Sequence, residues 1–420
     1  MISKWLISGL GIKRWIFLLC VGVFILGASC GGAYNVAAII GLDCNLLIGA
    51  ALIISVVSLV KIILFVEKII KIASSGHIDD YFHGIKLKKR VADLPSIVMI
   101  GGGTGLSTML RGVREYSGDS KNLAAIVTVA DDGGSSGRLR EEMNILPPGD
   151  IRNCLIALST EEALLTKLFQ YRFKDSTKLS GHSFGNLFIA AMTEVTGDFL
   201  KAVKESSKIL AVSGKVLPST DIALSLRAVY EDGSIVNGES QIAFNALNKK
   251  IRSVHIEPWD AKALPEALDE IRKAKIIIIG PGSLYTSLMP NLLINEIKEA
   301  VRQSPALKIY ICNVMTQPGE TDNYSAYDHL NVINAALGGD SIDYIVVSDV
   351  TNASEELLAK YKAARAEPVK IDIERIARSG VKVVRADLSA ARDFLRHDPD
   401  KLAACVLEII KRKLIDKSEK

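Results

Sequence analysis

The sequence has few cysteines, and none of them belongs to a recognised motif. There is no Cys-x-x-Cys pair and no grouping of cysteine with histidine at zinc-binding spacing. This absence excludes a disulfide-rich scaffold and a structural zinc site, and it indicates reduced thiols. The six cysteines are Cys20, Cys30, Cys44, Cys154, Cys312 and Cys405.

The sequence also lacks a large excess of charge of one sign. The formal net charge is +4 at pH 7, and apart from one cluster at 86–90 the Lys and Arg residues are spread through the chain. This balance is too mild for a dedicated nucleic-acid-binding protein, so we expect no nucleic acid as a partner. The 420 residues suffice for two or three domains, or for one large α/β core with an appendage.

Two long apolar runs are present near the amino terminus. Trp15 to Ala33 is almost uninterrupted, and Leu46 to Val66 is broken only by Lys61. Each run reaches the ~20 residues that one membrane span needs. Lys and Arg residues precede the first run and follow the second, but none lies between them, so the positive-inside rule predicts both ends in the cytoplasm.

These runs predict a transmembrane helical hairpin at residues 1–70, a juxtamembrane linker at 71–94 and a globular domain at 95–420. The predicted localisation is the inner (cytoplasmic) membrane, multi-pass, with attachment through residues 15–66 and the domain in the cytoplasm. One alternative is a signal peptide that ends near Gly27–Cys30, but the second apolar run and the cysteine pattern argue against it. A buried hairpin of a soluble domain is another, which the length and lack of charge disfavour.

After the linker, the pattern alternates between strand and helix. A strand at 96–100, a helix at 104–116 and a strand at 124–129 form a βαβ unit, and its apolar strands suit a parallel sheet. Helices expected at 163–173 and 184–210 form an insertion. The predicted fold is therefore α/β, a Rossmann-like, doubly wound, mainly parallel sheet with a helix-rich insertion.

The first predicted strand runs directly into a glycine-rich turn. Glycines allow a tight turn and close approach of a ligand, and the following helix would aim backbone N–H groups at an anion. The spacing matches neither the dinucleotide fingerprint nor the P-loop, so a turn without a ligand stays an alternative. The candidate phosphate-binding residues are Gly101, Gly102, Gly103, Thr104 and Gly105.

The second predicted strand ends at an acidic loop rich in glycine and serine. Open α/β sheets bind ligands beyond the carboxyl ends of their strands, where Asp131 and Asp132 would bind a ribose or a Mg²⁺ ion bridged to phosphate. Ser135, Ser136 and Arg138 would form a phosphate nest and clamp. The alternative is a plain turn with a solvated acid pair.

Two further segments carry residues typical of binding sites. Asp150 precedes a predicted helix and would either cap it or take part in catalysis. His182 and Asn186 lie at the start of another predicted helix, where an anion is favoured and a histidine can transfer a proton. A structural His182 beside a capping Ser183 is the alternative.

Two later strand ends complete the predicted cleft. A strand at 275–279 ends in a Gly-Pro-Gly-Ser turn, where Gly282 and Ser283 would contact phosphate. A strand at 308–312 ends in a polar segment, in which Asn313 and Thr321 suit hydrogen bonds to a sugar or a base.

In six stretches the chain resembles the YvcK/GlmR-type proteins, often called gluconeogenesis factors, of the CofD-like superfamily. The matching motifs, in chain order, are GGGTGLS at 101–107, ADDGGSSGRLR at 130–140, GDIRN at 149–153, GHSFGN at 181–186, GPGSLYTS at 280–287 and NVMTQPGET at 313–321.

The resemblance implies a regulatory protein that binds UDP-sugars, chiefly UDP-N-acetylglucosamine. The implied role is support of cell-wall precursor synthesis, cell shape and growth on gluconeogenic carbon sources. A cell-wall precursor enzyme such as glucosamine-6-phosphate synthase is the implied protein partner, Mg²⁺ is the one candidate cofactor, and a homo-oligomer stays open. Family members are usually soluble cytoplasmic proteins, so the predicted hairpin departs from their pattern.

A transferase is the competing hypothesis. The transferase branch of the superfamily typically carries Asp-Leu-Asp-Thr where this chain has Gly149–Arg152, and this loss of an acid weakens the transferase interpretation. An enzyme would transfer a nucleotidyl or phospho group in the same cleft, with Asp132 as metal ligand and His182 as acid and base. No nucleophile with a paired base is evident, which favours a binding protein.

Overall fold

The chain separates into two compact units, Met1–Ala92 and Asp93–Lys420. The computed structural model describes residues 12–30, 44–74, 94–116, 120–160, 163–174, 178–245, 249–350, 353–391 and 395–418. Most of the predicted juxtamembrane linker at 71–94, including the basic cluster at 86–90, lies outside these described residues.

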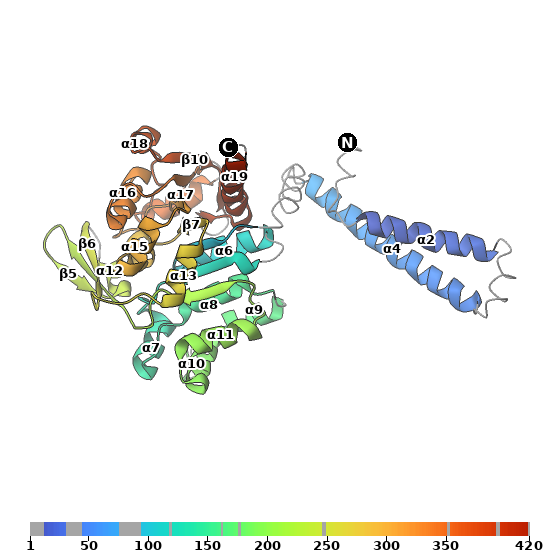
Figure 1. Cartoon of the computed structure of the whole chain (residues 1–420), viewed down its shortest axis with the longest axis horizontal. Helices are drawn as coiled ribbons and strands as arrows, with labels where there is room; N and C mark the ends of the chain where they lie inside the picture. Colours follow the sequence, from blue (N-terminus) through green and yellow to red (C-terminus); the bar gives the residue numbers. More distant parts are fainter. Residues whose placement is uncertain are drawn as a thin grey trace. The chain divides into compact units, whose positions relative to one another are not determined.

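The first unit is a helical hairpin of α2 (Ile12–Cys30) and α4 (Cys44–Ser74), which pack against each other along their length (Figure 1). Within the described residues, no helix is long and apolar enough to cross a membrane. The uncharged part of α2 runs only from Trp15 to Cys30, and that of α4 only from Cys44 to Val60, both shorter than the ~20 residues of a span. The predictions of a transmembrane hairpin, of attachment through residues 15–66 and of a multi-pass localisation are therefore contradicted.

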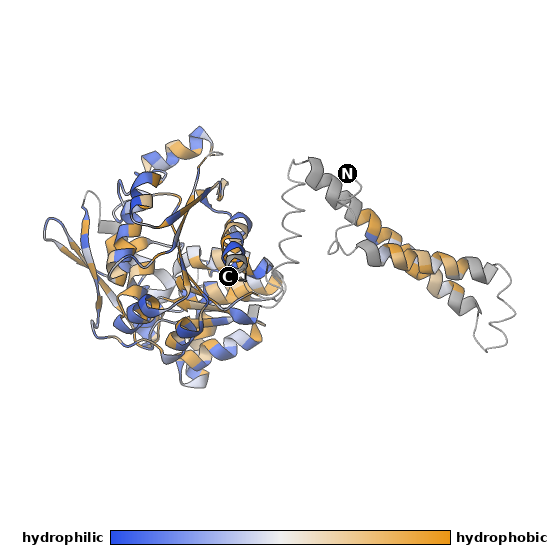
Figure 2. Cartoon of the chain, turned by 45° about the horizontal axis from the view of Figure 1, so that its top comes forward, coloured by the Kyte–Doolittle hydropathy of each residue, from blue (hydrophilic) through white to orange (hydrophobic). Residues whose placement is uncertain are grey.

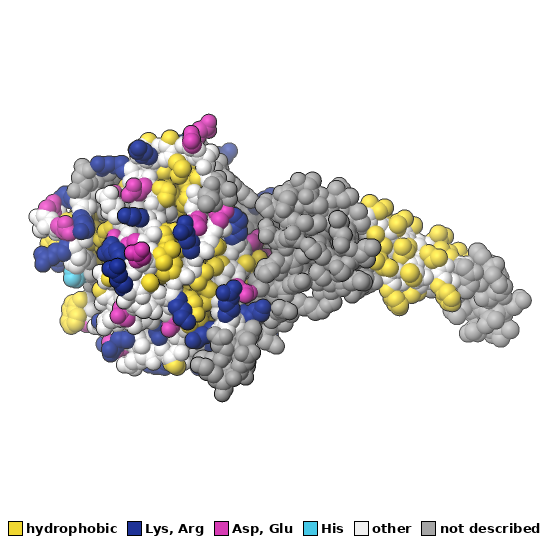
Figure 3. All heavy atoms as spheres, turned by 90° about the horizontal axis from the view of Figure 1, so that it is seen from above, with side chains coloured by type: hydrophobic (Ala, Val, Ile, Leu, Met, Phe, Trp, Pro, Cys, Tyr) yellow, Lys and Arg dark blue, Asp and Glu magenta, His cyan; other side chains and the backbone are white. Residues whose placement is uncertain are grey.

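The outer surface of the hairpin is nonetheless apolar. Phe17 and Phe24 of α2 are 67% and 75% exposed, and the described part of α4 exposes Ile53 and Val56 among others. The hydropathy colouring and the space-filling view both show this apolar surface (Figures 2 and 3).

The second unit is built on a seven-stranded sheet in which every pairing is parallel. Its central strands are buried along their whole length because helices cover both faces, which is why they read as unbroken apolar runs in the sequence. The predicted parallel α/β sheet is thus confirmed. In spatial order the strands are β10 (Lys382–Ala386), β9 (Tyr344–Ser348), β8 (Leu307–Ile311), β7 (Ile276–Ile279), β1 (Ile97–Gly101), β2 (Leu123–Val127) and β3 (Lys215–Pro218).

The strand order reverses between β1 and β7. The chain moves outward from β1 through β2 to β3, then returns to pair β7 with the other side of β1 and continues to β8, β9 and β10. This is the arrangement of a doubly wound sheet, and ligands of such sheets bind outside the carboxyl ends of the strands at the reversal point.

Helices connect the strands and pack in groups. Among other contacts, α6 packs against α8 and α19, and α15 packs against α13 and α16. The helices are α6 (Gly103–Tyr116), α7 (Gly134–Met143), α8 (Gly149–Leu158), α9 (Ala163–Gln170), α10 (Phe184–Thr196), α11 (Phe199–Ile209), α12 (Glu239–Asn245), α13 (Pro265–Lys273), α14 (Met289–Leu292), α15 (Asn295–Gln303), α16 (Ala326–Leu337), α17 (Glu355–Ala363), α18 (Ile373–Arg378) and α19 (Pro399–Ser418), with a 3-10 helix η1 (Ser120–Asn122) and a π-helix η2 (Leu284–Leu288).

The segment between β2 and β3 is helical, in line with the predicted insertion. The single helix predicted at 184–210 is instead two helices. Gly197, with φ 69°, ends α10, and the Asp198 carboxylate then caps α11 by accepting the N–H of Lys201 at 2.7 Å.

A small antiparallel sheet projects from the main one (Figure 1). It consists of β4 (Ser225–Tyr230), β5 (Ile235–Asn237) and β6 (Ile251–Glu257), with α12 between β5 and β6. Inward and outward side chains alternate along β4, as expected for a sheet with one buried face.

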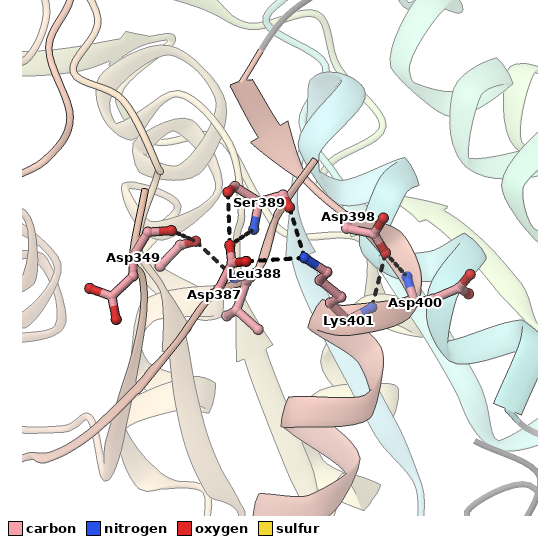
Figure 4. Close-up of polar contacts among 8 residues, drawn as sticks. Asp349, Asp387, Leu388, Ser389, Asp398, Asp400 and Lys401 are labelled. Carbon is pink, nitrogen blue, oxygen red and sulfur yellow. Dashed lines mark hydrogen bonds and ion pairs between the residues drawn. The ribbon is translucent and has the colours of Figure 1, made fainter. Parts of the chain in front are cut away.

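The carboxyl-terminal segment returns to the main sheet through a short hairpin of β11 (Ser389–Ala391) and β12 (Leu395–His397). The Asp398 carboxylate accepts the N–H groups of Asp400 and Lys401 at 3.0 Å each and so starts α19 (Figure 4). Lys401 donates to Asp387 at 3.3 Å and to the carbonyl of Ser389 at 3.2 Å. These bonds tie the hairpin to α19.

Candidate ligand-binding site

The loops after β1 and β7 meet at the reversal point, and glycine is required where they touch. A Cβ atom at Gly105 would lie 2.4 Å from the carbonyl oxygen of Pro281. One at Gly102 would lie 2.5 Å from Thr128 and 2.8 Å from the Asp150 carboxylate. Both distances are far shorter than a van der Waals contact. Gly105 therefore allows the backbone to approach that of Pro281, and Gly102 makes room for the side chains of Thr128 and Asp150.

Gly103 begins α6 and holds the left-handed conformation, with φ 63°. Its N–H donates to the Asp150 carboxylate at 2.6 Å. Asp150 is thus not the predicted cap of α8, because Pro148 occupies the N-cap position and the carboxylate crosses to the glycine turn. Burial, followed by the charge of Asp131, raises the pKa of Asp150 to about 6.

The segment after β8 clamps the loop after β7. The Asn313 side chain binds both backbone polar groups of Gly282, accepting from its N–H at 3.3 Å and donating to its carbonyl at 2.9 Å. Gln317 donates to the Ser283 hydroxyl at 2.7 Å. The fully buried Thr321 does not face a ligand; its hydroxyl accepts the N–H of Gln317 at 2.9 Å and holds the clamp in place.

The Glu320 side chain hydrogen-bonds to η2, the helix that follows the Gly282–Ser283 turn. Its buried carboxylate accepts the hydroxyl of Thr286 at 3.2 Å and the N–H of Tyr285 at 3.3 Å, both in η2. Burial raises the pKa of Glu320 to about 7.

A cavity of about 540 Å³ opens above these strand ends. This volume lies within the range of small-molecule sites. Among its lining residues are Gly102, Gly103, Thr104, Gly105, Thr108, Glu239, Pro281, Gly282, Ser283, Ser287, Asn313, Gln317, Tyr361, Ala366, Arg396 and His397.

Carboxylates gather at one side of this cavity. Glu239 of α12 lines it, and burial together with the charges of Asp131, Asp150 and Asp132 raises the pKa of Glu239 to about 9. The acid pair is held by backbone donors, since Asp131 accepts the N–H of Gly133 at 3.0 Å and Asp132 that of Ser240 at 2.9 Å. Negative charge therefore accumulates beside the glycine turn without a neutralising cation from the described lining residues other than Arg396.

The β11–β12 hairpin adds two residues to the opposite side of the cavity. Arg396 is exposed at its rim, and His397 is buried. Burial lowers the pKa of His397 to about 4, so this histidine is neutral at pH 7.

The remaining predicted site residues form a separate buried network between α7, α8 and α10. Asn186 donates to Ser135 at 3.0 Å and to Ser136 at 3.5 Å, and it accepts from Arg152 at 2.7 Å. His182 completes the network through a 3.0 Å hydrogen bond between its Nδ1 and Ser135. These side chains do not line the cavity, and they hydrogen-bond mainly to one another; the buried Nε of Arg152 has no hydrogen-bond partner.

The same region shows the structural alternative for the loop at 180–186. Ser183 is the N-cap of α10 and accepts the N–H of Asn186 at 3.2 Å. Arg138 donates to the carbonyl of Ser180 at 2.7 Å. Burial and the neighbouring Arg138 lower the pKa of His182, so it is a neutral side chain at pH 7.

The structure thus divides the predicted site residues. The cavity brings together Gly102, Gly103, Thr104, Gly105, Gly282, Ser283 and Asn313, while Gly101 lies buried beneath it. The other predicted site residues do not line it, namely Asp131, Asp132, Ser135, Ser136, Arg138, His182, Asn186 and Thr321. Sequence reasoning missed Glu239, Arg396 and His397, because the first follows a short strand of the small sheet and the others lie in a terminal hairpin that carries no motif.

The described side chains alone do not form a complete metal site. Over the residues that the structure describes, no group of three or more His, Cys, Asp or Glu side chains has the geometry to hold a metal ion by itself. A Mg²⁺ ion that bridges phosphate needs only one or two carboxylates, because the ligand and water supply the other oxygens. Asp131 and Asp150 supply that donor chemistry, and the raised pKa of Asp150 fits the presence of uncompensated negative charge.

Residues 97–389 match the family model described as 2-phospho-L-lactate transferase CofD. The gluconeogenesis factor of Bacillus subtilis is 50% identical over 318 residues, which cover 76% of this chain and 98% of the relative. A relative in Nostoc is 44% identical over 425 residues, covering 96% of this chain and 92% of its own. A crystal structure of a Bacillus halodurans protein, 49% identical, covers 75% of this chain and all of its own with a TM-score of 0.71.

Proposed function

Because the chain belongs to the family of the 2-phospho-L-lactate transferase CofD, as its motifs predict, we propose that it binds a nucleotide sugar, UDP-N-acetylglucosamine, and acts as a regulator. The observation that carries this proposal is the cavity of about 540 Å³ at the reversal point of the sheet. There the start of α6, the Gly282–Ser283 turn and the Asn313–Gln317 clamp line one space with glycine backbone and neutral polar side chains. Such a surface suits a diphosphate and a sugar.

The negative charge near the cavity determines whether a diphosphate needs a cation in order to bind. A diphosphate would enter a cavity that lies close to the carboxylates of Asp131, Asp132 and Asp150, whose charges raise the pKa of the lining Glu239. Like charges at this distance repel, so a divalent cation would have to lie between the phosphates and the carboxylates. We therefore expect binding that depends on Mg²⁺, with Asp131 and Asp150 as its protein ligands and Asp132 as a further candidate.

The cellular role rests on the relatives. The Bacillus subtilis relative is named as a gluconeogenesis factor. We extend this role to the present chain as support of growth on gluconeogenic carbon sources, and we add cell-wall precursor supply and cell shape because the ligand is a cell-wall precursor. Glucosamine-6-phosphate synthase is the protein partner that this role would require, and its co-purification with the tagged full chain tests that part.

A transferase that uses the same cleft is the second candidate. The observation that favours it is the Asp150 carboxylate, whose pKa of about 6 suits proton transfer near neutral pH. In a uridylyl transfer, an oxygen of a sugar 1-phosphate would attack the α-phosphorus of UTP, and the bond to pyrophosphate would break. The bound Mg²⁺ would neutralise the developing charge.

Calorimetric titration of the full chain with UDP-N-acetylglucosamine, with and without MgCl₂, tests the proposal. We expect saturable binding with Mg²⁺ and much weaker binding in EDTA. No heat under either condition would refute the nucleotide-sugar proposal. Release of pyrophosphate from UTP and N-acetylglucosamine 1-phosphate would replace the regulator with the transferase.

A further inference from the structure

A second cavity, of about 480 Å³, lies beside the candidate ligand-binding site and belongs to none of the functions above. It shares Ala366 with the first cavity, and the segment 320–324 after the clamp forms part of its wall. Its lining residues are Lys249, Lys250, Glu320, Asp322, Asn323, Tyr324, Lys362, Arg365, Ala366 and Glu367. The first cavity has one cationic side chain in its lining, Arg396, whereas this one has four.

The four cations come from two separate parts of the fold. Lys362 lies in the last turn of α17 with Arg365 just beyond it, and Lys249 and Lys250 precede β6 in the small sheet. The Lys362 ammonium is exposed and makes no hydrogen bond or ion pair with another described side chain. Chain segments far apart in sequence thus bring positive charge to one hollow.

The two lysines that precede β6 form ion pairs at the surface. Lys249 lies 3.0 Å from Asp232 and also donates to the Ser234 hydroxyl at 2.8 Å, and Lys250 lies 3.1 Å from Glu231, with both lysines and both carboxylates at least 37% exposed. Ion pairs of this kind contribute little to stability because solvent screens them. These partners therefore leave both ammonium groups able to bind a stronger anion in the cavity.

The backbone is strained at two residues that line the second cavity. Arg365 has φ 62° and Asn323 has φ 60°, so two of the four non-glycine residues with positive φ in the described chain line this one cavity. Asparagine tolerates this conformation, but glycine is the residue usually found where a helix ends this way. The turn does not explain why position 365 is an arginine, and we attribute the residue to a function of its side chain.

The acidic and neutral side chains of the second cavity indicate which chemical groups the ligand carries besides an anionic one. Asp322, Glu367 and Asn323 offer hydrogen-bond acceptors, and Tyr324 offers a hydroxyl that is hydrogen-bonded to that of Tyr285 at 2.9 Å. Carboxylates beside ammonium groups suit a molecule that carries both hydroxyls and an anionic group. A bare polyanion would be repelled by the carboxylates, and a neutral sugar would leave the Lys362 ammonium without an anionic partner.

We propose that this second cavity binds a small phosphorylated polyhydroxy compound, of the sugar-phosphate class, with Lys362 and Arg365 on the phosphate and Asp322 and Glu367 on the hydroxyls. The site is distinct from the nucleotide-sugar cavity, and the proposal does not depend on what that cavity binds.

Calorimetry of the full chain with glucose 6-phosphate, inorganic phosphate and glucose tests this site. We expect glucose 6-phosphate to bind more tightly than either of the other two probes. Lys362→Ala and Arg365→Gly should each weaken binding about tenfold, the effect of losing one charge-assisted hydrogen bond. Lys360→Ala, an exposed lysine on the same helix that lines neither cavity, is the matched control and should leave the affinity unchanged.

Arg365→Gly also separates binding from folding, because glycine adopts φ 62° without the strain of a side chain. Its thermal midpoint should therefore not fall while its affinity for glucose 6-phosphate does. No heat with glucose 6-phosphate, or equal losses in Lys360→Ala and Lys362→Ala, would overturn the proposal. Inorganic phosphate binding as tightly as glucose 6-phosphate would refute the polyhydroxy part, and competition by UDP-N-acetylglucosamine would place the ligand in the first cavity instead.

Discussion

The turn at Gly101–Gly105 and the network around Asn186 differ in what their polar groups face. At the glycine turn, the backbone lies open to a cavity of about 540 Å³ formed by strand ends. In the network, Ser135, His182, Asn186 and Arg152 hydrogen-bond to one another inside the protein. Both regions carry conspicuous motifs in the sequence, yet only the first offers groups to a ligand.

The difference shows that a motif rich in polar residues can serve packing as well as binding. A buried hydroxyl, amide or guanidinium must be hydrogen-bonded, so a group of them in the interior forms a closed network. A backbone that approaches another backbone needs glycine, and the glycines of this turn line the cavity. Variants of the glycine turn should therefore change ligand affinity, and variants of the network should change stability.

The largest effect is expected for Gly105→Val. Its Cβ would lie 2.4 Å from the Pro281 carbonyl oxygen, so the two strand-end loops must separate and the cavity must change shape. We expect the affinity for UDP-N-acetylglucosamine to fall by about 100-fold or more, measured by calorimetry. The control is Gly133→Ala, whose Cβ would make an ordinary contact at 3.5 Å, and near-normal affinity of both variants would contradict the role of the turn.

Asp150→Asn should have the next largest effect. It removes a carboxylate that would bind Mg²⁺ while retaining an oxygen that can accept the N–H of Gly103. We expect about tenfold weaker nucleotide-sugar binding in Mg²⁺ and little further loss in EDTA. Asp269→Asn, on the exposed side of α13, is the control, and an undiminished Mg²⁺ dependence in Asp150→Asn would remove Asp150 from the metal site.

Asn186→Ala should lower stability without changing ligand affinity, and this variant therefore distinguishes the network from the glycine turn. The substitution leaves Ser135, Ser136 and Arg152 with one fewer partner in the interior, which costs about 2 kcal/mol and lowers the thermal midpoint by about 5 °C. The affinity for the nucleotide sugar should stay within about twofold of wild type. Asn237→Ala, an exposed residue of β5, provides the control for stability, and a loss of affinity without a loss of stability would place Asn186 in the ligand site.

The smallest effect concerns the pH dependence of stability. The pKa of Glu239 is raised in the folded protein from 4.5 to about 9, so the unfolded chain ionises first and the free energy of unfolding falls as pH rises between these values. Glu239→Gln removes this contribution. In metal-free buffer, urea unfolding should show the variant gaining stability relative to wild type as the pH rises from 4.5 to 9, and the two proteins equally stable near pH 4.5. An identical pH profile for both proteins would show that Glu239 is not buried among charges.

The parallel sheet was predictable because each strand is a short apolar run that ends at a turn. The strand ends Gly101, Gly280 and Asn313 could be assigned to one cleft for the same reason, since parallel strands share a carboxyl edge. The strand β3 could not be found, as four residues at Lys215–Pro218 carry no distinct pattern. The predicted membrane span was wrong because apolar composition does not reveal where a helix begins and ends, and within the described residues no helix is long and apolar enough to cross a membrane.

The site was harder to predict than the fold. Asp150 has the sequence context of a helix cap, and only the tertiary structure shows its carboxylate 2.6 Å from the Gly103 nitrogen. Glu239 and His397 reach the cavity from the small sheet and from a terminal hairpin, and their proximity depends on contacts distant in sequence. His182 and Asn186 looked equivalent to the glycine turn because a sequence shows polar residues but not their partners.

Hydrogen exchange of the full chain with and without UDP-N-acetylglucosamine and Mg²⁺ tests the central claim most directly. Binding at the reversal point predicts slower exchange of the amides at 101–108, 280–288 and 313–317, with no change in the network helices α7 and α10. Slower exchange confined to α7 and α10, or absent from the three strand-end segments at saturating ligand, would contradict it.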